Sequence, residues 1–131
     1  MIVLDENVLD GQRLLLEASR VAIKQIGVDI GHKGMKDDEI IVLLRKQRNL
    51  SFFTRDAGFY VPGLRHRRYC LIVMNVGQNQ VATFVRRFLR HSHFDTQAKR
   101  TGCVVRISHA GLAAWRLGLQ REIHVVWSAR R

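Results

Sequence analysis

The residues Leu50-Ser51-Phe52-Phe53-Thr54-Arg55-Asp56 form an apolar run that ends in an acid. A short apolar run bounded by polar residues indicates a buried strand, so we predict a strand over 50–54. The chain opens with a similar run, Ile2–Asp5. Ligands of parallel sheets bind beyond the carboxyl ends of the strands. If these two strands are central and parallel, the carboxylates of Asp5 and Asp56 emerge at the same edge of the sheet.

Strands and helices alternate along the rest of the chain. Further strands are predicted at 28–30, 69–76 and 103–107, helices at 12–26, 37–48 and 80–91, and a closing hairpin at 112–117 and 123–127. This alternation favours an α/β fold, a three-layer α/β/α sandwich with a central, mainly parallel sheet. We predict a single domain over 1–131, with a core at 1–108 and a C-terminal β-hairpin extension at 109–131.

The composition is that of a soluble globular protein. The chain has 131 residues, of which 47% are hydrophobic and 25% are charged, which suffices for a core of its own. Its longest apolar runs, such as 70–74, are too short to cross a membrane, and its first residues lack the basic region of a signal peptide. We therefore expect a cytoplasmic protein without membrane contacts. Cys70 and Cys103 are expected to be buried free thiols rather than a disulfide.

The charges are divided unequally between the two halves of the chain. Residues 1–56 hold nine acids and nine bases, whereas residues 57–131 hold two acids and thirteen bases, twelve of them arginine. Arginine matches phosphate oxygens with two parallel hydrogen bonds, and a cationic surface attracts polyanions. This favours RNA or another nucleic acid over the alternative, an acidic protein partner. The arginines expected to contact phosphates are Arg55, Arg65, Arg67, Arg68, Arg86, Arg87 and Arg90.

Three acidic clusters are candidates for a metal site. They are Asp5-Glu6 with Asn7, Asp37-Asp38-Glu39 at the start of a predicted helix, and Asp56. Carboxylates that converge in a cleft repel one another and persist there mainly when a cation lies between them. A set of oxygen ligands suits Mg²⁺ or Mn²⁺ rather than zinc. The alternative for each acid alone is a helix cap or a turn residue.

The same motifs resemble a known family. Leu4-Asp5-Glu6-Asn7, Asp37-Asp38-Glu39-Ile40 and Thr54-Arg55-Asp56 followed by Phe59 are similar to motifs of the PIN-like proteins associated with bacterial toxin–antitoxin pairs. The resemblance extends to about residue 108. It implies a parallel α/β/α sandwich. The VapC-type toxins among the relatives are endoribonucleases that depend on Mg²⁺ or Mn²⁺.

The resemblance also implies roles for individual residues. Asp5 would be the central metal ligand, Asp37 the acid from the helix start with Asp38 as the alternative, and Asp56 the acid that closes the site. Thr54 would orient Asp56 through its hydroxyl, and Glu6 or Asn7 would support the ligands from outside. The implied reaction is in-line attack of metal-activated water on an RNA phosphodiester.

One departure from the family pattern concerns the number of acids. The family often carries a second aspartate two positions after the acid at 56, where this chain has Gly58. Three hypotheses follow. The chain is a ribonuclease toxin with an antitoxin protein as partner, or a nucleic-acid-binding module that has lost catalysis. The third is a protein-binding module that docks an acidic antitoxin-like partner or forms a homodimer through the C-terminal hairpin.

Overall fold

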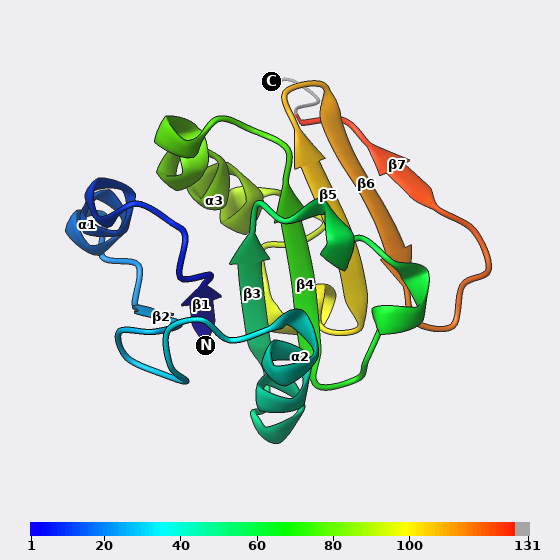
Figure 1. Cartoon of the computed structure of the whole chain (residues 1–131). Helices are drawn as coiled ribbons and strands as arrows, with labels where there is room; N and C mark the ends of the chain where they lie inside the picture. Colours follow the sequence, from blue (N-terminus) through cyan, green and yellow to red (C-terminus); the bar gives the residue numbers. More distant parts are fainter. Residues whose placement is uncertain (128–131) are drawn as a thin grey trace.

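In the computed structural model, which describes residues 1–127, seven strands form one sheet in the order β2-β1-β3-β4-β5-β6-β7 (Figure 1). The strands are β1 (Ile2–Leu4), β2 (Ile23–Gln25), β3 (Leu50–Thr54), β4 (Tyr69–Met74), β5 (Cys103–Ser108), β6 (Gly111–Arg116) and β7 (Ile123–Val125). The α-helices are α1 (Asp10–Ala18), α2 (Asp37–Lys46), α3 (Val81–Arg90) and α4 (Gln97–Arg100). Short 3-10 helices lie at η1 (Ala57–Phe59), η2 (Pro62–Leu64) and η3 (Gln78–Gln80).

The sheet is mixed, although its first five strands in the spatial order are parallel. Leu4 of β1 pairs with Phe53 of β3, and Phe53 pairs with Ile72 of β4. β5 and β6 pair antiparallel, and β7 adds antiparallel to β6. The α/β class and the parallel arrangement of β1 and β3 are therefore confirmed. Because β1 and β3 are neighbours with the same direction, whatever follows them in the sequence emerges at one edge of the sheet.

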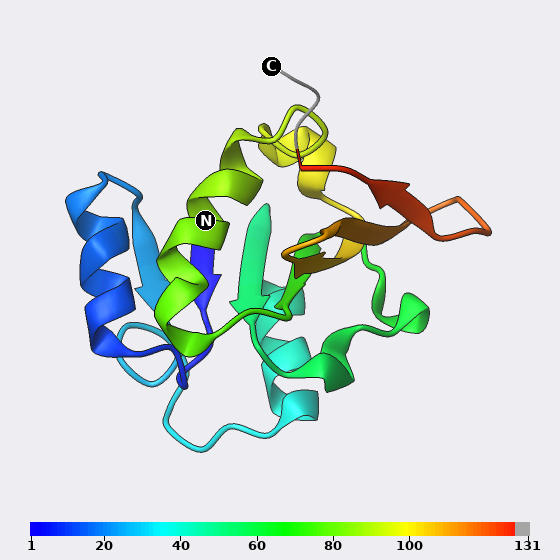
Figure 2. The same ribbon diagram turned by 90° about the horizontal axis from the view of Figure 1, so that it is seen from above.

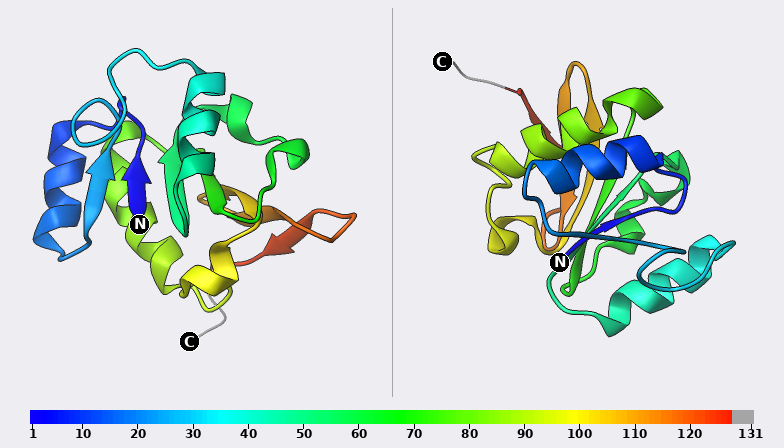
Figure 3. Two further views of the ribbon diagram at one scale, coloured as in Figure 1. Left: turned by 90° about the horizontal axis from the view of Figure 1, so that it is seen from below. Right: turned by 90° about the vertical axis from the view of Figure 1, so that its left-hand side faces the viewer.

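The helices lie on both faces of the sheet. α1 and α3 cover one face and α2 covers the other, as Figure 2 shows from above and the right panel of Figure 3 from the side. Two groups of buried side chains correspond to these faces: one includes Phe53, Ile72 and Phe88, and the other includes Phe52, Leu71 and Leu44. Successive strand residues point to opposite faces, so the continuous apolar runs of β3 and β4 supply both cores.

The predicted helix over 12–26 is wrong in its second half. α1 ends at Ala18, and Arg20 adopts a left-handed conformation with φ of 63°. Residues Ile23–Gln25 instead form β2, which pairs with β1 at the edge of the sheet. The apolar spacing was misleading because Leu14 and Leu15 on α1 are 58% and 49% exposed. The strand expected at 28–30 is also absent from the sheet, apart from a single bridge between Ile26 and Ile30.

Three further expectations have structural outcomes. Cys70 and Cys103 are both buried and free, as predicted. No α-helix within residues 1–127 has the length and apolar character needed to cross a membrane. The strand expected to run to Val76 stops at Met74, although the Asn75 N–H still donates to the Ile107 carbonyl of β5.

Candidate active site at the carboxyl edge of the sheet

Asp5 and Asp56 lie at the edge where β1 and β3 end. The Asp5 N–H donates to the Phe53 carbonyl at 2.9 Å, which extends the pairing of the two strands by one residue. Asp56 follows Thr54 after a single residue, Arg55. A pocket of about 300 Å³ opens at this point and is lined by Asp5, Asn7, Val8, Arg55 and Asp56. The topology thus places both predicted carboxylates in one cavity.

Thr54 holds the Asp5 carboxylate in a defined orientation. Its side chain is fully buried, and its hydroxyl donates to Asp5 Oδ2 at 2.6 Å while accepting from the Asp56 N–H at 3.0 Å. The second oxygen of Asp5, Oδ1, accepts from the Glu6 N–H at 2.8 Å. The expected role of Thr54 therefore needs correction. Its hydroxyl positions the Asp5 side chain and touches only the backbone of Asp56.

The Asp56 carboxylate is fixed by its own turn. Its Oδ1 accepts from the Gly58 N–H at 2.8 Å, so Asp56 forms the N-terminal cap of η1. A Cβ atom at Gly58 would lie 3.1 Å from Asp56 Oδ1 and 3.9 Å from Asp37 Oδ2. Position 58 therefore points at the acidic group, and glycine leaves that space open.

Asp37 reaches the same group from a different layer of the fold. It is the exposed first residue of α2, and its Oδ2 borders the space beside Gly58 that Asp56 Oδ1 also borders. Burial raises the pKa of Asp37, and the negative charges of Asp56, Asp5 and Asp38 raise it further. The helix start is closed by Glu39 instead, whose Oε1 accepts from the Lys36 N–H. Asp37 is therefore free from a capping role.

Asp38 and Glu6, the two acids next to Asp37 and Asp5 in the sequence, make other contacts. Asp38 accepts from the Glu39 N–H and lines a separate pocket with Met35 and Leu43. Glu6 accepts from the Gly34 N–H at 2.9 Å and so anchors the loop that precedes α2. Of the residues predicted to support the ligands, only Asn7 lines the cavity itself.

Asp5 carries the buried charge of the site. Its side chain is 8% exposed, and this burial is the largest cause of its raised pKa. The hydrogen bonds from Thr54 and from the Glu6 N–H oppose that rise, whereas the charges of Glu6 and Asp56 add to it. Three carboxylates from β1, α2 and β3 thus share one negative region in which each raises the cost of ionising another.

Gln25 is a supporting residue that the sequence did not reveal. It is 1% exposed at the end of β2, and its Nε2 donates to the carbonyls of Asp5 at 3.0 Å and Val8 at 2.9 Å. Its Oε1 accepts from Arg13 at 3.2 Å. These bonds satisfy the backbone of the loop that carries Asp5 and Asn7. A lone glutamine within an apolar stretch was the available signal, but the stretch was assigned to a helix.

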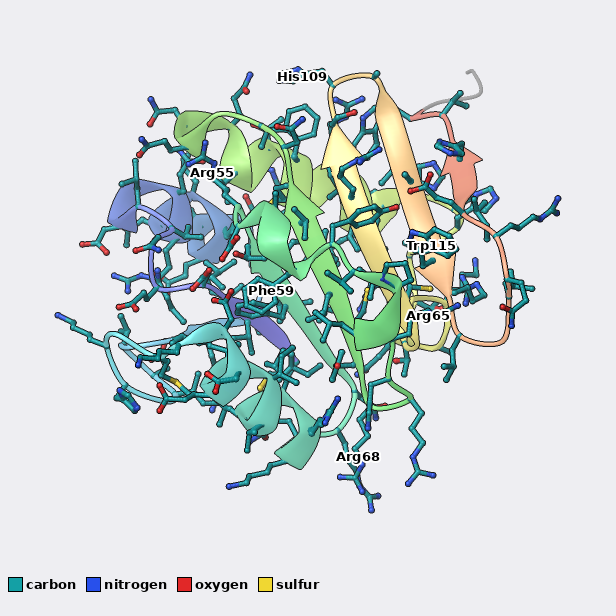
Figure 4. The ribbon with its side chains drawn as sticks, turned by 45° about the vertical axis from the view of Figure 1, so that its right-hand side comes forward. Arg55, Phe59, Arg65, Arg68, His109 and Trp115 are labelled. Atoms are coloured by element: carbon teal, nitrogen blue, oxygen red, sulfur yellow. The ribbon has the colours of Figure 1, made fainter. Side chains whose placement is uncertain are left out.

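Among the predicted phosphate-binding arginines, only Arg55 lines the acidic pocket. Its Nε donates to the Val76 carbonyl, so its position is fixed by the loop after β4 (Figure 4). Arg65 donates to the carbonyls of Arg116 and Leu119, and Arg86 donates to Ser19. Arg87 stacks on Phe84 and Trp127, while Arg90 ends α3. The arginines expected to contact phosphates thus lie on several surfaces, and Arg67 and Arg68 lie at the opposite edge of the sheet.

The chemistry of the acidic group suits a hard cation. Its donors are carboxylate oxygens, as Mg²⁺ and Mn²⁺ require, and a cation would relieve the repulsion that raises the pKa of Asp5 and Asp37. Within residues 1–127, no three His, Cys, Asp or Glu side chains already close around a common ion position. Comparisons with protein-family models, with curated proteins and with solved structures find no match to this chain.

Proposed function

We propose that this chain is a metal-dependent endoribonuclease on a PIN-like three-layer scaffold with a C-terminal β-hairpin. The observation that carries the proposal is that Asp5 and Asp56 line one pocket at the carboxyl edge of the sheet, while the exposed Asp37 borders the space beside Gly58 and Asp56. Burial and the neighbouring negative charges raise the pKa of Asp5 and Asp37. Such an arrangement is unfavourable without a cation, and perturbed carboxylates in a cavity are typical of functional sites.

Asp5, Asp37 and Asp56 would hold Mg²⁺ or Mn²⁺. A bound ion of this kind supplies Lewis acidity that stabilises charge on a phosphate in transfer. The residues of the chain contribute orientation and charge. Thr54 keeps Asp5 Oδ2 directed by its 2.6 Å hydrogen bond, and Gln25 holds the loop that carries Asp5. Arg55 places a guanidinium in the same pocket, where it would contact a phosphate oxygen of RNA.

The biological setting that we propose is a toxin–antitoxin pair in the cytoplasm, with a protein antitoxin as the partner. Within residues 1–127, the edge strand β7 (Ile123–Val125) has no neighbouring strand on one side of its backbone. A free strand edge can pair with another chain. A homodimer through the C-terminal hairpin would use this edge.

The test of the proposal is RNA cleavage by a matched set of variants. Cleavage should require Mg²⁺ or Mn²⁺ and should be lost in Asp5→Asn and Asp37→Asn. Asp38→Asn is the matched control, because it removes the adjacent charge from the same helix start without touching the pocket. If Asp37→Asn cleaves as fast as Asp38→Asn, or Asp5→Asn as fast as the wild type, the proposal is wrong.

A second candidate function is nucleic-acid binding without cleavage, and Gly58 favours it. The space beside Asp56 and Asp37 lacks the fourth carboxylate that a second metal ion would use. Tight, salt-sensitive RNA binding with no cleavage in either metal, by the wild type and by Asp5→Asn alike, would establish this function instead.

A further inference from the structure

A second polar pocket lies at the edge of the sheet opposite the acids. It is about 380 Å³ in volume and is lined by Arg48, Asn49, Arg67 and Arg68. Arg48 and Asn49 precede β3, whereas Arg67 and Arg68 precede β4, so the pocket lies at the amino ends of two parallel strands. Figure 4 shows Arg68 and the pocket-lining Arg55 at opposite ends of the strands.

The positive charge of this pocket has no acidic counterpart close by. None of the ion pairs found within residues 1–127 involves Arg48, Arg67 or Arg68. The three arginines of the pocket repel one another. Because arginine stays protonated in proteins, loss of a proton cannot relieve this repulsion. Burial and the charges of Arg45, Arg67 and Arg68 lower the pKa of His66, which reports the positive field around the pocket.

The backbone that presents the arginines is ordered by specific contacts. The Arg68 N–H donates to His66 Nδ1 at 3.1 Å, and the His66 ring stacks on Tyr69. The Tyr69 hydroxyl in turn donates to the Leu64 carbonyl. On the other side, Asn49 adopts a left-handed conformation with φ of 57°, and its carbonyl accepts from the Gln97 side chain. Both segments are therefore held in place before any ligand arrives, which lowers the entropic cost of binding.

The lining indicates the class of ligand. All four lining residues are polar and none is aromatic or apolar, whereas the centre of a protein–protein interface is typically apolar and enriched in aromatic residues. A planar guanidinium fits the paired oxygens of a phosphate.

The separation of the two pockets sets a minimum length for an RNA that binds to both. β4 has six residues and spans about 20 Å at about 3.3 Å per residue. A stacked strand with about 3.4 Å per nucleotide needs about six nucleotides to cover that distance.

We propose that Arg48, Arg67 and Arg68, together with Asn49, form a binding site for the phosphodiester backbone of RNA that is separate from the acidic pocket. The effect on catalysis rests on the proposed function. An RNA long enough to occupy both pockets is held at two points, whereas an RNA shorter than about six nucleotides reaches only one pocket. Substrate length then determines cleavage: the arginine pocket can hold an RNA at the acidic pocket only when the RNA is long enough to contact both.

The test uses binding and cleavage in parallel. Binding is measured with Asp5→Asn protein and non-structured RNAs of about five and about fifteen nucleotides, which fall on either side of the required span. Adding Arg48→Ala and Arg67→Ala should weaken binding of the longer RNA by about fivefold per arginine at 0.1 M salt. The two substitutions together should also reduce the slope of log affinity against log salt concentration for the longer RNA by about 1.4, because each lost phosphate contact removes about 0.7. Binding of the shorter RNA should also weaken, because this RNA binds the arginine pocket by itself. Metal-dependent cleavage of the shorter RNA by protein with an intact Asp5 should stay unchanged, because this RNA cannot contact both pockets at once.

The matched control removes two exposed bases elsewhere, with Lys24→Ala and Arg121→Ala. Equal losses in the two double variants would show that only the overall charge matters and would overturn the proposal. Equal losses of kcat/KM for cleavage of the short and the long RNA would overturn the two-point arrangement. In a competition experiment, polyglutamate could displace the bound RNA at a lower concentration of negative charges than unlabelled RNA does. This result would assign the pocket to an acidic protein and would also overturn the proposal. The cleavage arm tests the nuclease separately: length-dependent binding without any cleavage supports the arginine pocket and removes the proposed enzymatic activity alone.

Discussion

Individual residues show the clearest division between what the sequence predicts and what it leaves open. The acids were identifiable because an acid after an apolar run is visible in the sequence, and the position of Asp5 and Asp56 at one edge followed from parallel strands. The target of the Thr54 hydroxyl was not identifiable. Thr54 lies next to Asp56 in sequence, but the adjacent strand brings Asp5 closer to its hydroxyl.

Thr54→Val tests this hydrogen bond. Valine has the same shape but leaves Asp5 Oδ2 and the Asp56 N–H without their buried partner. We expect the free energy of unfolding to fall by about 1–3 kcal/mol and the pKa of Asp5 to rise, because the bond favours the ionised form. Thr54→Ser should restore both. Chemical denaturation and an NMR titration of Asp5 measure these effects, and an unchanged Asp5 pKa in Thr54→Val would contradict the assignment.

Asp56→Asn tests the repulsion among the acids without added metal. A carboxyl group whose pKa is raised on folding contributes its full stability below the unfolded value of 3.8, and this stability is lost as pH rises through the folded pKa. Removing the Asp56 charge should therefore raise the melting temperature at pH 7 and have little effect below pH 3.8. Asparagine keeps the oxygen that accepts from Gly58.

Asp95→Asn provides the control of opposite sign. The hydrogen bond and charge of Lys99 lower the pKa of Asp95, so its contribution is present above pH 3.8 and lost below it. This variant should not be stabilised at pH 7. A melting temperature that rises equally in Asp95→Asn and Asp56→Asn would show that the gain comes from general charge removal.

At the scale of elements, long runs that are buried on both sides were predictable and short edge elements were not. β3 and β4 are continuous apolar runs, and their positions match the sequence closely. β2 has three residues, lies at the edge and includes the exposed Lys24, so its pattern carries little signal. Its formation depends on pairing with β1 and on the side chain of Gln25, which are contacts between distant parts of the sequence.

Gln25→Glu tests the contribution of β2 to the site. The amide of Gln25 donates to the carbonyls of Asp5 and Val8, and a carboxylate would place a negative charge against these oxygens. We expect destabilisation by at least about 1–3 kcal/mol at neutral pH, with partial recovery as acidification protonates the new group. Chemical denaturation at two pH values measures this. Gln120→Glu, at an exposed position before β7, serves as the control for adding an acid.

For the whole molecule, the unequal charge of the two halves of the chain does not reveal where the acidic and basic side chains lie in the fold. The acids gather at the carboxyl edge of the sheet, and an arginine pocket lies at the amino edge. The sequence could not show this, because residues 65–68 precede β4 while Asp56 follows β3. The two strands run in the same direction, so these nearby segments end up at opposite edges.

Metal addition tests the acidic edge as a unit. A ligand that binds only the folded state stabilises it by RT ln(1 + [L]/Kd), so Mn²⁺ at about a hundred times its Kd should add about 2.7 kcal/mol. We expect the melting temperature of the wild type and of Asp38→Asn to rise with Mn²⁺, and that of Asp5→Asn and Asp37→Asn to stay constant. Thermal unfolding over a Mn²⁺ series, with EDTA as the reference, measures the shifts. Equal rises in all four proteins would place the ion elsewhere.

The two edges also differ in their response to protons. Asp5 and Asp37 have raised pKa values and lose their charges early on acidification, whereas the arginines of the opposite pocket keep theirs. Mild acid therefore reduces the electric dipole moment along the strands while the net charge increases from +11. At neutral pH, the RNA of the proposed function would meet a field with a positive and a negative end, which would orient the RNA along the strands. In acid the negative end weakens, so the field would attract RNA with less orientation.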